Sequence, residues 1–192
     1  MAPEHGQITI YLERLRGGDP AAADAMLPLV YEELRHIAGL LLRGGRPGHT
    51  LQPTALVHEA WLKIQGALGG GAQIHDRTHF LAVAARAMRQ VLVNHARDRK
   101  AQKRGGDARR LPLDDCVELI EAETGDLVAL NDVLDRLAGD DPRSARIVEM
   151  RVFGGMTVEE VADALDLATS TVKSDWRFAR SWLERELGRE GA

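Results

Sequence analysis

Apolar residues recur at intervals of three and four along most of the chain, a spacing that places them on one face of an α-helix. In the first half these stripes predict helices over residues 8–16, 19–43, 54–65 and 80–100. In the second half they predict helices over 127–137 and 141–153, followed by a helical pair that continues to the end. Ala and Leu are abundant and aromatic residues make up only 4%, which also favours packed helices. We therefore expect an all-α fold.

Residues 156–180 have the pattern of a helix-turn-helix. Thr157 and Glu160 have the spacing of a capping box, so the first helix should begin near Val158. The turn would consist of residues 166–168, and its first residue, an aspartate, tolerates a left-handed backbone better than most residues. This pair of helices is the strongest indication of function in the sequence.

The second helix of this pair has two different faces. Val172, Trp176 and Ala179 point inward by their spacing, and Thr169 or Ser170 can cap the helix start. The outer face carries hydroxyl groups and cations, on Ser170, Thr171, Lys173, Ser174, Arg177 and Arg180. In a helix-turn-helix such residues meet base edges and phosphates in the DNA major groove. One residue disagrees, because Asp175 puts a negative charge on or near that face, and a helical hairpin with a solvated polar face is the alternative.

The predicted helix over residues 54–65 also separates into two faces. Its buried side should consist of Leu56, Ala60 and Ile64, with Val57 and Trp61 beside them. Its outward side would then hold His58, Glu59, Leu62 and Lys63. An exposed Leu among charges can be incidental, yet Trp and Leu beside charges also make good interface anchors.

The predicted helix over residues 80–100 combines an apolar stripe with a basic face. The inner stripe consists of Phe80, Val83, Ala84, Ala87, Met88, Val91 and Leu92. The outer surface would be shared by Arg86, Arg89, Gln90, Asn94, Arg97 and Arg99 or Lys100. Cations suit phosphates, and amides can read base edges. A solvated basic helix is the alternative, but it does not explain the amides among the arginines.

The net charge of −4 hides two opposite blocks. Residues 86–110 hold nine Lys or Arg and two Asp, whereas residues 111–141 hold ten Asp or Glu and one Arg. The basic block suits phosphate, and the acidic block suits a basic partner surface. Because residues 101–125 contain glycines and Pro112 but little periodicity, they read as a charged linker. The sequence thus predicts two small helical domains, 8–100 and 126–190, joined by this linker, and the second contains the helix-turn-helix.

Other chemistry has little support in the sequence. Cys116 is the only cysteine, which excludes an intrachain disulfide and fits a reducing cytoplasm. The N-terminus has no signal-peptide pattern and no stretch is apolar enough to span a bilayer, so we expect a cytoplasmic protein without membrane insertion. His75 and His79 lie four apart without further ligands nearby, so we expect no metal site. No catalytic group assembles by its spacing, so we expect neither an enzyme nor a cofactor.

Taken together, these stretches resemble a bacterial RNA polymerase sigma factor of the extracytoplasmic-function (ECF) group. Residues 55–63, Ala-Leu-Val-His-Glu-Ala-Trp-Leu-Lys, resemble the family's Asp-Leu-Val-Gln-Glu-Val-Phe-Leu-Arg helix. Residues 80–100 resemble its promoter-reading helix, and residues 165–180, with Thr-Val-Lys-Ser at 171–174, resemble its terminal helix-turn-helix. Each motif alone is of moderate specificity. Their order and spacing make the resemblance strong, and it covers nearly the whole chain.

The resemblance implies a protein that binds core RNA polymerase, through its β′ and β subunits, and directs promoter-specific transcription initiation. A region 2-like domain over 8–100 would dock on the β′ coiled coil through Leu56, His58, Glu59, Trp61, Leu62 and Lys63. The helix from Arg86 to Lys100 would engage the −10 element, and the glycine-rich loop 66–79 would receive a flipped base. A region 4-like domain over 126–190 would read the −35 element, while the acidic part of the linker would thread through basic polymerase channels.

The chain also departs from the family pattern. Several positions carry a residue other than the usual one: Ala55, His58, Val83, Asn94, Asp166 and Asp175. We take these departures to indicate an atypical subgroup with its own promoter preference. Whether an anti-sigma factor restrains the protein stays open. The alternative function is a stand-alone regulator that binds DNA through the same helix-turn-helix without core polymerase, usually as a symmetric dimer.

Overall fold

The computed structural model describes residues 3–19, 21–42, 51–69, 74–102 and 127–190. Within these ranges the chain is entirely helical, which confirms the expected fold class. The first half contains α1 (Pro3–Arg16), α2 (Ala21–Leu42), α3 (Pro53–Gly69) and α4 (Arg77–Gln102). The second half contains α6 (Leu127–Asp140), α7 (Pro142–Gly154), α8 (Val158–Leu165) and α9 (Thr169–Glu190). Residues 103–125 of the expected linker lie outside the described residues.

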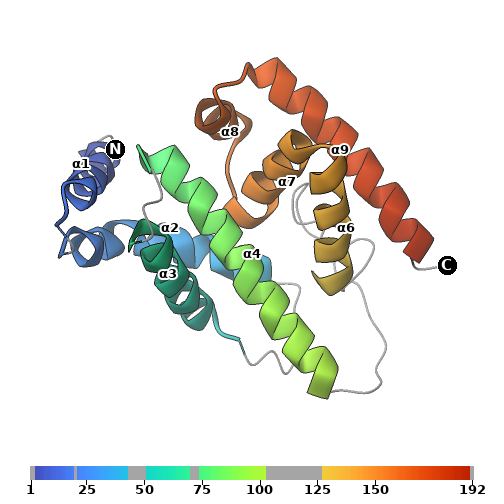
Figure 1. The fold of residues 1–192 in the computed structure, drawn as a ribbon, viewed down its shortest axis with the longest axis horizontal. Coiled ribbons are helices and arrows are strands. Elements are labelled where there is room, and N and C mark those ends of the chain that lie inside the picture. Colours follow the sequence, from blue (N-terminus) through green and yellow to red (C-terminus); the bar gives the residue numbers. More distant parts are fainter. Residues whose placement is uncertain (1–2, 20, 43–50, 70–73, 103–126, 191–192) are drawn as a thin grey trace.

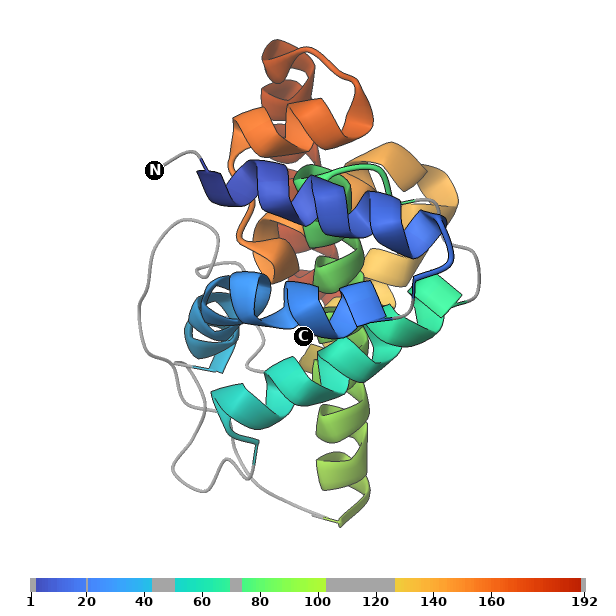
Figure 2. The same cartoon turned by 90° about the vertical axis from the view of Figure 1, so that its left-hand side faces the viewer.

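The long helix α4 lies between the other helices of the two halves (Figure 1). It packs against α3 on one side and against α7 on the other, and it also contacts α1, α6 and α8. The view turned by 90° shows α1, α2 and α3 arranged over this helix (Figure 2). The two faces of α4 are therefore covered by different halves of the chain.

Buried apolar side chains from both halves join in one continuous cluster. In α2 the expected stripe is confirmed by Met26, Val30, Leu34 and Ile37, which are all buried. In α6 and α7 the core residues include Leu134 and Phe153, and residues of α4 such as Phe80 and Met88 belong to the same cluster. Burial of this kind is the main favourable contribution to folding.

Short polar side chains at the helix starts set the boundaries that the sequence indicated. Asp19 accepts a hydrogen bond from the Ala21 backbone N–H (3.1 Å) ahead of α2. Asp141 accepts hydrogen bonds from the backbone N–H and the hydroxyl of Ser144, at 3.0 and 2.6 Å, which holds the pKa of its carboxyl below the usual value. α7 then ends at Gly154 and is capped by Gly155, which has a φ of 60°, as expected from the glycine pair.

Several boundaries differ from the sequence-based expectation: α1 begins at Pro3 rather than at residue 8, and α6 continues to Asp140 rather than ending at residue 137. α3 continues past Gln65 to Gly69, and α4 begins at Arg77 rather than at Phe80. Leu68, although it follows Gly66, is partly buried against the core, and this packing offsets the helix penalty of glycine. The expected glycine-rich loop 66–79 is therefore much shorter, and residues 70–73 within it lie outside the described residues.

Candidate nucleic-acid interface

The helix-turn-helix has the local geometry that the sequence predicted. Thr157 Oγ1 accepts a hydrogen bond from the Glu160 backbone N–H (3.2 Å), and Glu160 Oε2 accepts one from the Thr157 backbone N–H (2.9 Å). This capping box starts α8 at Val158. Asp166 ends the helix with a φ of 53°, so the aspartate does adopt the left-handed conformation. Both ends of α8 are thus fixed by local interactions.

The start of α9 differs from the expectation by one residue. The position before the helix belongs to Ala168, whose carbonyl accepts hydrogen bonds from the backbone N–H groups of Thr171 and Val172. The prediction that Thr169 or Ser170 caps the helix was therefore wrong, because both residues already lie in its first turn. As a result, the Ser170 side chain is exposed at the start of the helix.

The remaining part of α9 separates into a buried and an exposed face. Val172 and Ala179 are fully buried as predicted, and Trp176 is partly buried with the Arg151 guanidinium 4.9 Å from its ring centroid. The exposed residues of the predicted outer face are Ser170, Lys173, Ser174 and Arg177. Thr171 and Arg180 are half-buried, and Arg180 Nε donates to Glu184 Oε1 at 2.9 Å. The first three turns of α9 therefore present cations and hydroxyls to solvent.

An exposed aromatic residue extends this face and was missed by the sequence-based reasoning. Phe178 is 51% exposed, although it is a large apolar side chain. It follows Ser174 by four positions, so the two lie on the same side of the helix. The spacing could have revealed it, because position 178 falls outside the inward set of Val172, Trp176 and Ala179.

The position of Asp175 resolves the one apparent conflict on this helix. Its side chain is only 15% exposed, and its Oδ2 accepts a hydrogen bond from Arg143 Nε of α7 at 2.7 Å. The expectation that its negative charge opposes the outer face was wrong, because α7 supplies a partner for it. Asp175 therefore joins α7 to α9.

Replacing Asp175 with Arg is expected to destabilise the protein without tightening DNA binding. The substitution removes a charge-assisted hydrogen bond and places two cations together, so the free energy of unfolding should fall by roughly 1–3 kcal/mol. Urea unfolding measures this change, and Asp175→Asn is the milder control because its amide oxygen can still accept from Arg143. Tighter DNA binding with unchanged stability would mean that Asp175 faces DNA.

The exposed face of α4 contains most of the residues predicted for it. Arg86, Gln90, Asn94 and Arg97 are exposed, and their spacing places them on one side of the helix. Arg97 also lies 3.2 Å from Asp132 of α6. Arg99 and Lys100 belong to the same helix, but their side chains lie outside the described residues.

Arg89 does not share this outer surface. Its side chain is only 13% exposed and contacts acidic residues of α6 and α7. The sequence-based placement was wrong because α6 and α7 cover this side of α4, on which Leu81 and Ala85 are also buried. Because α6 and α7 are distant from Arg89 in the sequence, the spacing of apolar residues within α4 does not reveal that they cover it.

The two faces of α3 agree with the prediction. Leu56, Val57, Ala60 and Ile64 are fully buried, and Trp61 is 5% exposed. The outward residues are His58, Glu59, Leu62 and Lys63. Leu62 is 67% exposed, which makes it an apolar side chain surrounded by polar ones. Leu56 and Trp61 hold the helix in the core, so they are not available for direct contact with a partner in this arrangement.

The geometry thus combines a helix-turn-helix with a second exposed helix face of cations and amides. A model of the family described as ECF sigma factor matches residues 5–189 of this chain. The chain belongs to the ECF sigma factor family. A search of curated proteins found no match. As a sigma factor, the protein acts in transcription initiation, binds RNA polymerase and promoter DNA, and is not an enzyme.

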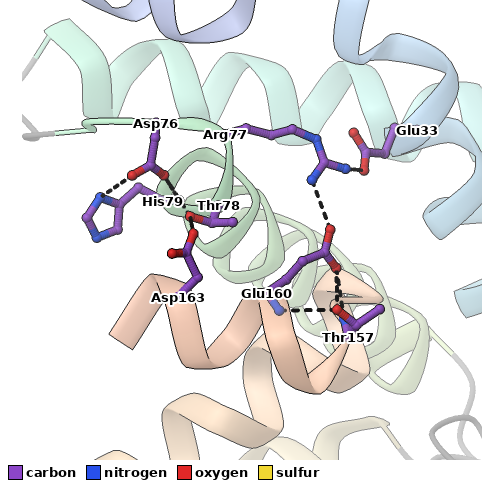
Figure 3. A network of polar contacts seen from close by, with 8 residues as sticks. All are labelled: Glu33, Asp76, Arg77, Thr78, His79, Thr157, Glu160 and Asp163. Carbon is purple, nitrogen blue, oxygen red and sulfur yellow. Dashed lines mark hydrogen bonds and ion pairs between the residues drawn. The ribbon is translucent and has the colours of Figure 1, made fainter. Parts of the chain in front are cut away.

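A polar network in the sigma factor joins the helix-turn-helix to α2 and α4 (Figure 3). Arg77, at the start of α4, pairs with Glu33 of α2, and its Nη1 donates to Glu160 Oε1 of α8 at 2.9 Å. Glu160 therefore uses one carboxylate oxygen for Arg77 and the other for the capping box. Partial burial acts to raise the pKa of Glu160, but hydrogen bonds from the Thr157 backbone and from Arg77 hold that pKa below its usual value.

The same network continues at the first turn of α4. Asp76 Oδ1 accepts a hydrogen bond from the His79 backbone N–H at 2.9 Å, so Asp76 caps this helix. The Thr78 hydroxyl lies 2.7 Å from Asp76 Oδ1 and 3.0 Å from Asp163 Oδ2 of α8. These contacts place α8 directly against the start of α4.

Two further features of the sigma factor concern metal binding and membrane insertion. The rings of His75 and His79 lie 5.4 Å apart, but within the described ranges no group of three His, Cys, Asp or Glu side chains could hold a metal ion. Among the helices that the structure describes, none combines the length and the apolar character needed to cross a membrane.

Proposed function

We propose that the sigma factor divides promoter recognition between two helical domains, over residues 8–100 and 126–190, joined by the charged linker 101–125. The exposed face of α9 would read the −35 element, and the exposed face of α4 would engage the −10 element. Membership of the ECF sigma factor family supports a role at promoters, and the chemistry of the two faces supports this division.

The proposal for the −35 element rests on the first three turns of α9. We assign base and phosphate contacts to Ser170, Thr171, Lys173, Ser174, Arg177 and Arg180, of which Thr171 and Arg180 are half-buried. Phe178 joins this set because it is exposed beside Ser174, and a Phe ring can contact a thymine methyl group in the major groove. The combination of cations, hydroxyls and one aromatic ring suits both positioning and base reading.

The proposal for the −10 element rests on α4. We assign it to Arg86, Arg89, Gln90, Asn94, Arg97, Arg99 and Lys100, of which Arg89 is engaged by acidic residues in this structure. The exposed amides of Gln90 and Asn94 can pair with base edges, while the arginines neutralise phosphate. A base extruded from the −10 element would enter the segment between α3 and α4.

Core polymerase would dock on the outward side of α3. Leu62 offers an exposed apolar side chain, and His58, Glu59 and Lys63 surround it with polar groups. An apolar side chain at the centre of a polar rim is typical of residues that anchor a protein–protein interface. The partner we propose for this helix is the β′ coiled coil, while Leu56 and Trp61 hold the helix in position. The β subunit is a second proposed partner, and the acidic part of the linker would thread through basic polymerase channels. The departures at Ala55, His58 and Asp175 support an atypical subgroup, and an anti-sigma factor is a further partner to be tested.

The observation that carries the proposal is the exposed face of α9. This helix follows directly after the capped helix α8 and the turn of the helix-turn-helix. The experiment is multi-template transcription of genomic fragments by purified core polymerase with and without the sigma factor, followed by sequencing of the RNA 5′ ends. Start sites that depend on the sigma factor should share two elements at nearly constant spacing. Arg177→Ala should relax the upstream element alone, and Gln90→Ala the downstream element alone.

Each outcome of this experiment has a distinct meaning. If no product depends on the added sigma factor, the proposed function fails. If both variants relax the same element, the division between α4 and α9 fails. Tight sequence-specific DNA binding by a dimer without polymerase would instead favour a stand-alone regulator.

A further inference from the structure

An arginine of α7 lies at the edge of the exposed face of α9. Arg143, in the first turn of α7, donates from Nε to Asp175 Oδ2 at 2.7 Å. The side chain of Arg143 is 55% exposed, whereas that of Asp175 is 15% exposed. Asp175 follows Thr171 by four positions and precedes Phe178 by three, so these three residues lie along one edge of α9. The guanidinium of Arg143 therefore adds to this edge a cation that belongs to another helix.

The contact with Asp175 uses only one part of the guanidinium. Among the described residues, the Arg143 guanidinium makes no hydrogen bond other than the one from Nε. The N–H groups on Nη1 and Nη2 remain, and N–H groups of this kind can meet two oxygens of one phosphate side by side. Asp141 is the other acid close to Arg143, but its carboxylate accepts hydrogen bonds from the backbone N–H and the hydroxyl of Ser144. Arg143 thus has donors for a second partner at the protein surface.

The position of this cation matches the border of a DNA major groove. The groove is about 12 Å wide, and a helix with its side chains has a diameter of about 10–12 Å, so a recognition helix fills the groove between the two phosphate backbones. A cation beside one edge of that helix then lies at a backbone rather than at the base edges. Phosphate contacts of this kind fix the register of a protein on DNA and carry no sequence information directly.

We propose that Arg143 binds a backbone phosphate at one edge of the −35 element and that Asp175 positions its guanidinium for this contact. Nε stays on Asp175, while Nη1 and Nη2 donate to the phosphate oxygens. A side chain that is already held in place loses less conformational freedom on binding than one without a partner. The inference rests on the proposed assignment of α9 to the −35 element, to which it adds a residue of α7.

The first test removes the cation. Arg143→Gln should weaken binding of the holoenzyme to promoter DNA about three- to tenfold, and the slope of log K against log salt should become shallower by about 0.9, the value for one phosphate. The matched control is Arg35→Gln, because Arg35 is 53% exposed and pairs with Glu32 at 3.2 Å but lies on α2. Fluorescence anisotropy with labelled promoter DNA at several KCl concentrations measures both quantities. Equal salt slopes for the two variants would overturn the proposal.

The second test locates the phosphate. Methylphosphonate linkages, which carry no charge, are placed one at a time along both strands of the −35 element. At one linkage the neutral group should weaken binding of the unmodified holoenzyme and of Arg35→Gln by the same factor, but it should not weaken binding of Arg143→Gln any further. If every linkage and Arg143→Gln instead act independently of each other, Arg143 contacts no phosphate and the proposal is wrong.

The role of Asp175 is tested by two substitutions at that position. Asp175→Ala should weaken promoter binding although it removes a negative charge, and Asp175→Asn should retain more of the affinity because its amide oxygen can still accept from Arg143. Circular dichroism checks that both variants are folded. Tighter binding by Asp175→Ala would mean that the carboxylate competes with the phosphate, which would overturn the positioning role. If the unmodified holoenzyme shows no promoter-specific binding, the proposed function itself fails.

Discussion

Reversing two exposed cations of α9, Lys173→Glu together with Arg177→Glu, is expected to abolish promoter-dependent transcription while leaving the fold intact. Both side chains lie on the solvent-exposed face, and neither forms an ion pair in the part of the chain that the structure describes. Loss of each contact with a base or phosphate costs about 1–3 kcal/mol, so the pair should lower −35 binding roughly 30-fold or more. Transcription from a promoter selected with the unmodified holoenzyme measures the effect.

The control for this variant changes the net charge by the same amount elsewhere. Arg16→Glu with Arg35→Glu places the reversed charges on α1 and α2, where both arginines are exposed. Arg35 pairs with Glu32 at 3.2 Å, but both side chains are mostly exposed, so the pair contributes little to stability. If the control loses as much transcription as the α9 variant, the effect comes from net charge and the assignment of α9 to the −35 element is wrong.

Gly154→Leu is expected to break the packing of α7 on α4. A leucine has no room there, since even its Cβ would lie 3.0 Å from Ala85 and 3.4 Å from Met156 Cγ. Overpacking of this kind costs about 1–3 kcal/mol or more. The free energy of unfolding in urea should fall accordingly, and the sedimentation coefficient should decrease if α7 moves away from α4.

Gly139→Leu is the matched comparison. Gly139 lies in α6, and a Cβ there would meet no atom within 4 Å, so the same substitution should be neutral or stabilise the helix by up to about 1 kcal/mol. Opposite effects at two helical glycines would confirm that the close contact of α7 with α4 exists in solution. Equal effects at the two positions would contradict it.

The sequence predicted those parts of the sigma factor that depend on near neighbours. The capping box of Thr157 and Glu160, the left-handed Asp166 and the cap at Asp141 all involve residues within four positions of each other. Helical periodicity likewise identified the buried and exposed sides of α3, because a stripe repeats within the helix itself. The resemblance to ECF sigma factors followed from the same local motifs, and the family match over residues 5–189 confirmed it.

Helix boundaries near glycine were predicted less well. The glycines after Gln65 suggested a loop, yet α3 continues to Gly69 because Leu68 packs against the core. The start of α4 was placed three residues late, although Asp76 is a usable cap signal three positions before His79. At the end of α3 a tertiary contact outweighed the low helix propensity of glycine. At the start of α4 the capping residue, rather than the first apolar residue, set the boundary.

The sequence by itself determined the helices, the helix-turn-helix and the family, since these depend on spacing and on contacts within a few residues. Only the tertiary structure decided the surroundings of individual charges. Arg89 was expected on the basic face, but Asp135 and Glu149, 46 and 60 positions away, bring it against α6 and α7. Asp175 was expected near DNA, but Arg143 of α7 neutralises it. Periodicity shows which side of a helix is apolar, whereas the partner of a charge depends on which distant helix packs beside it.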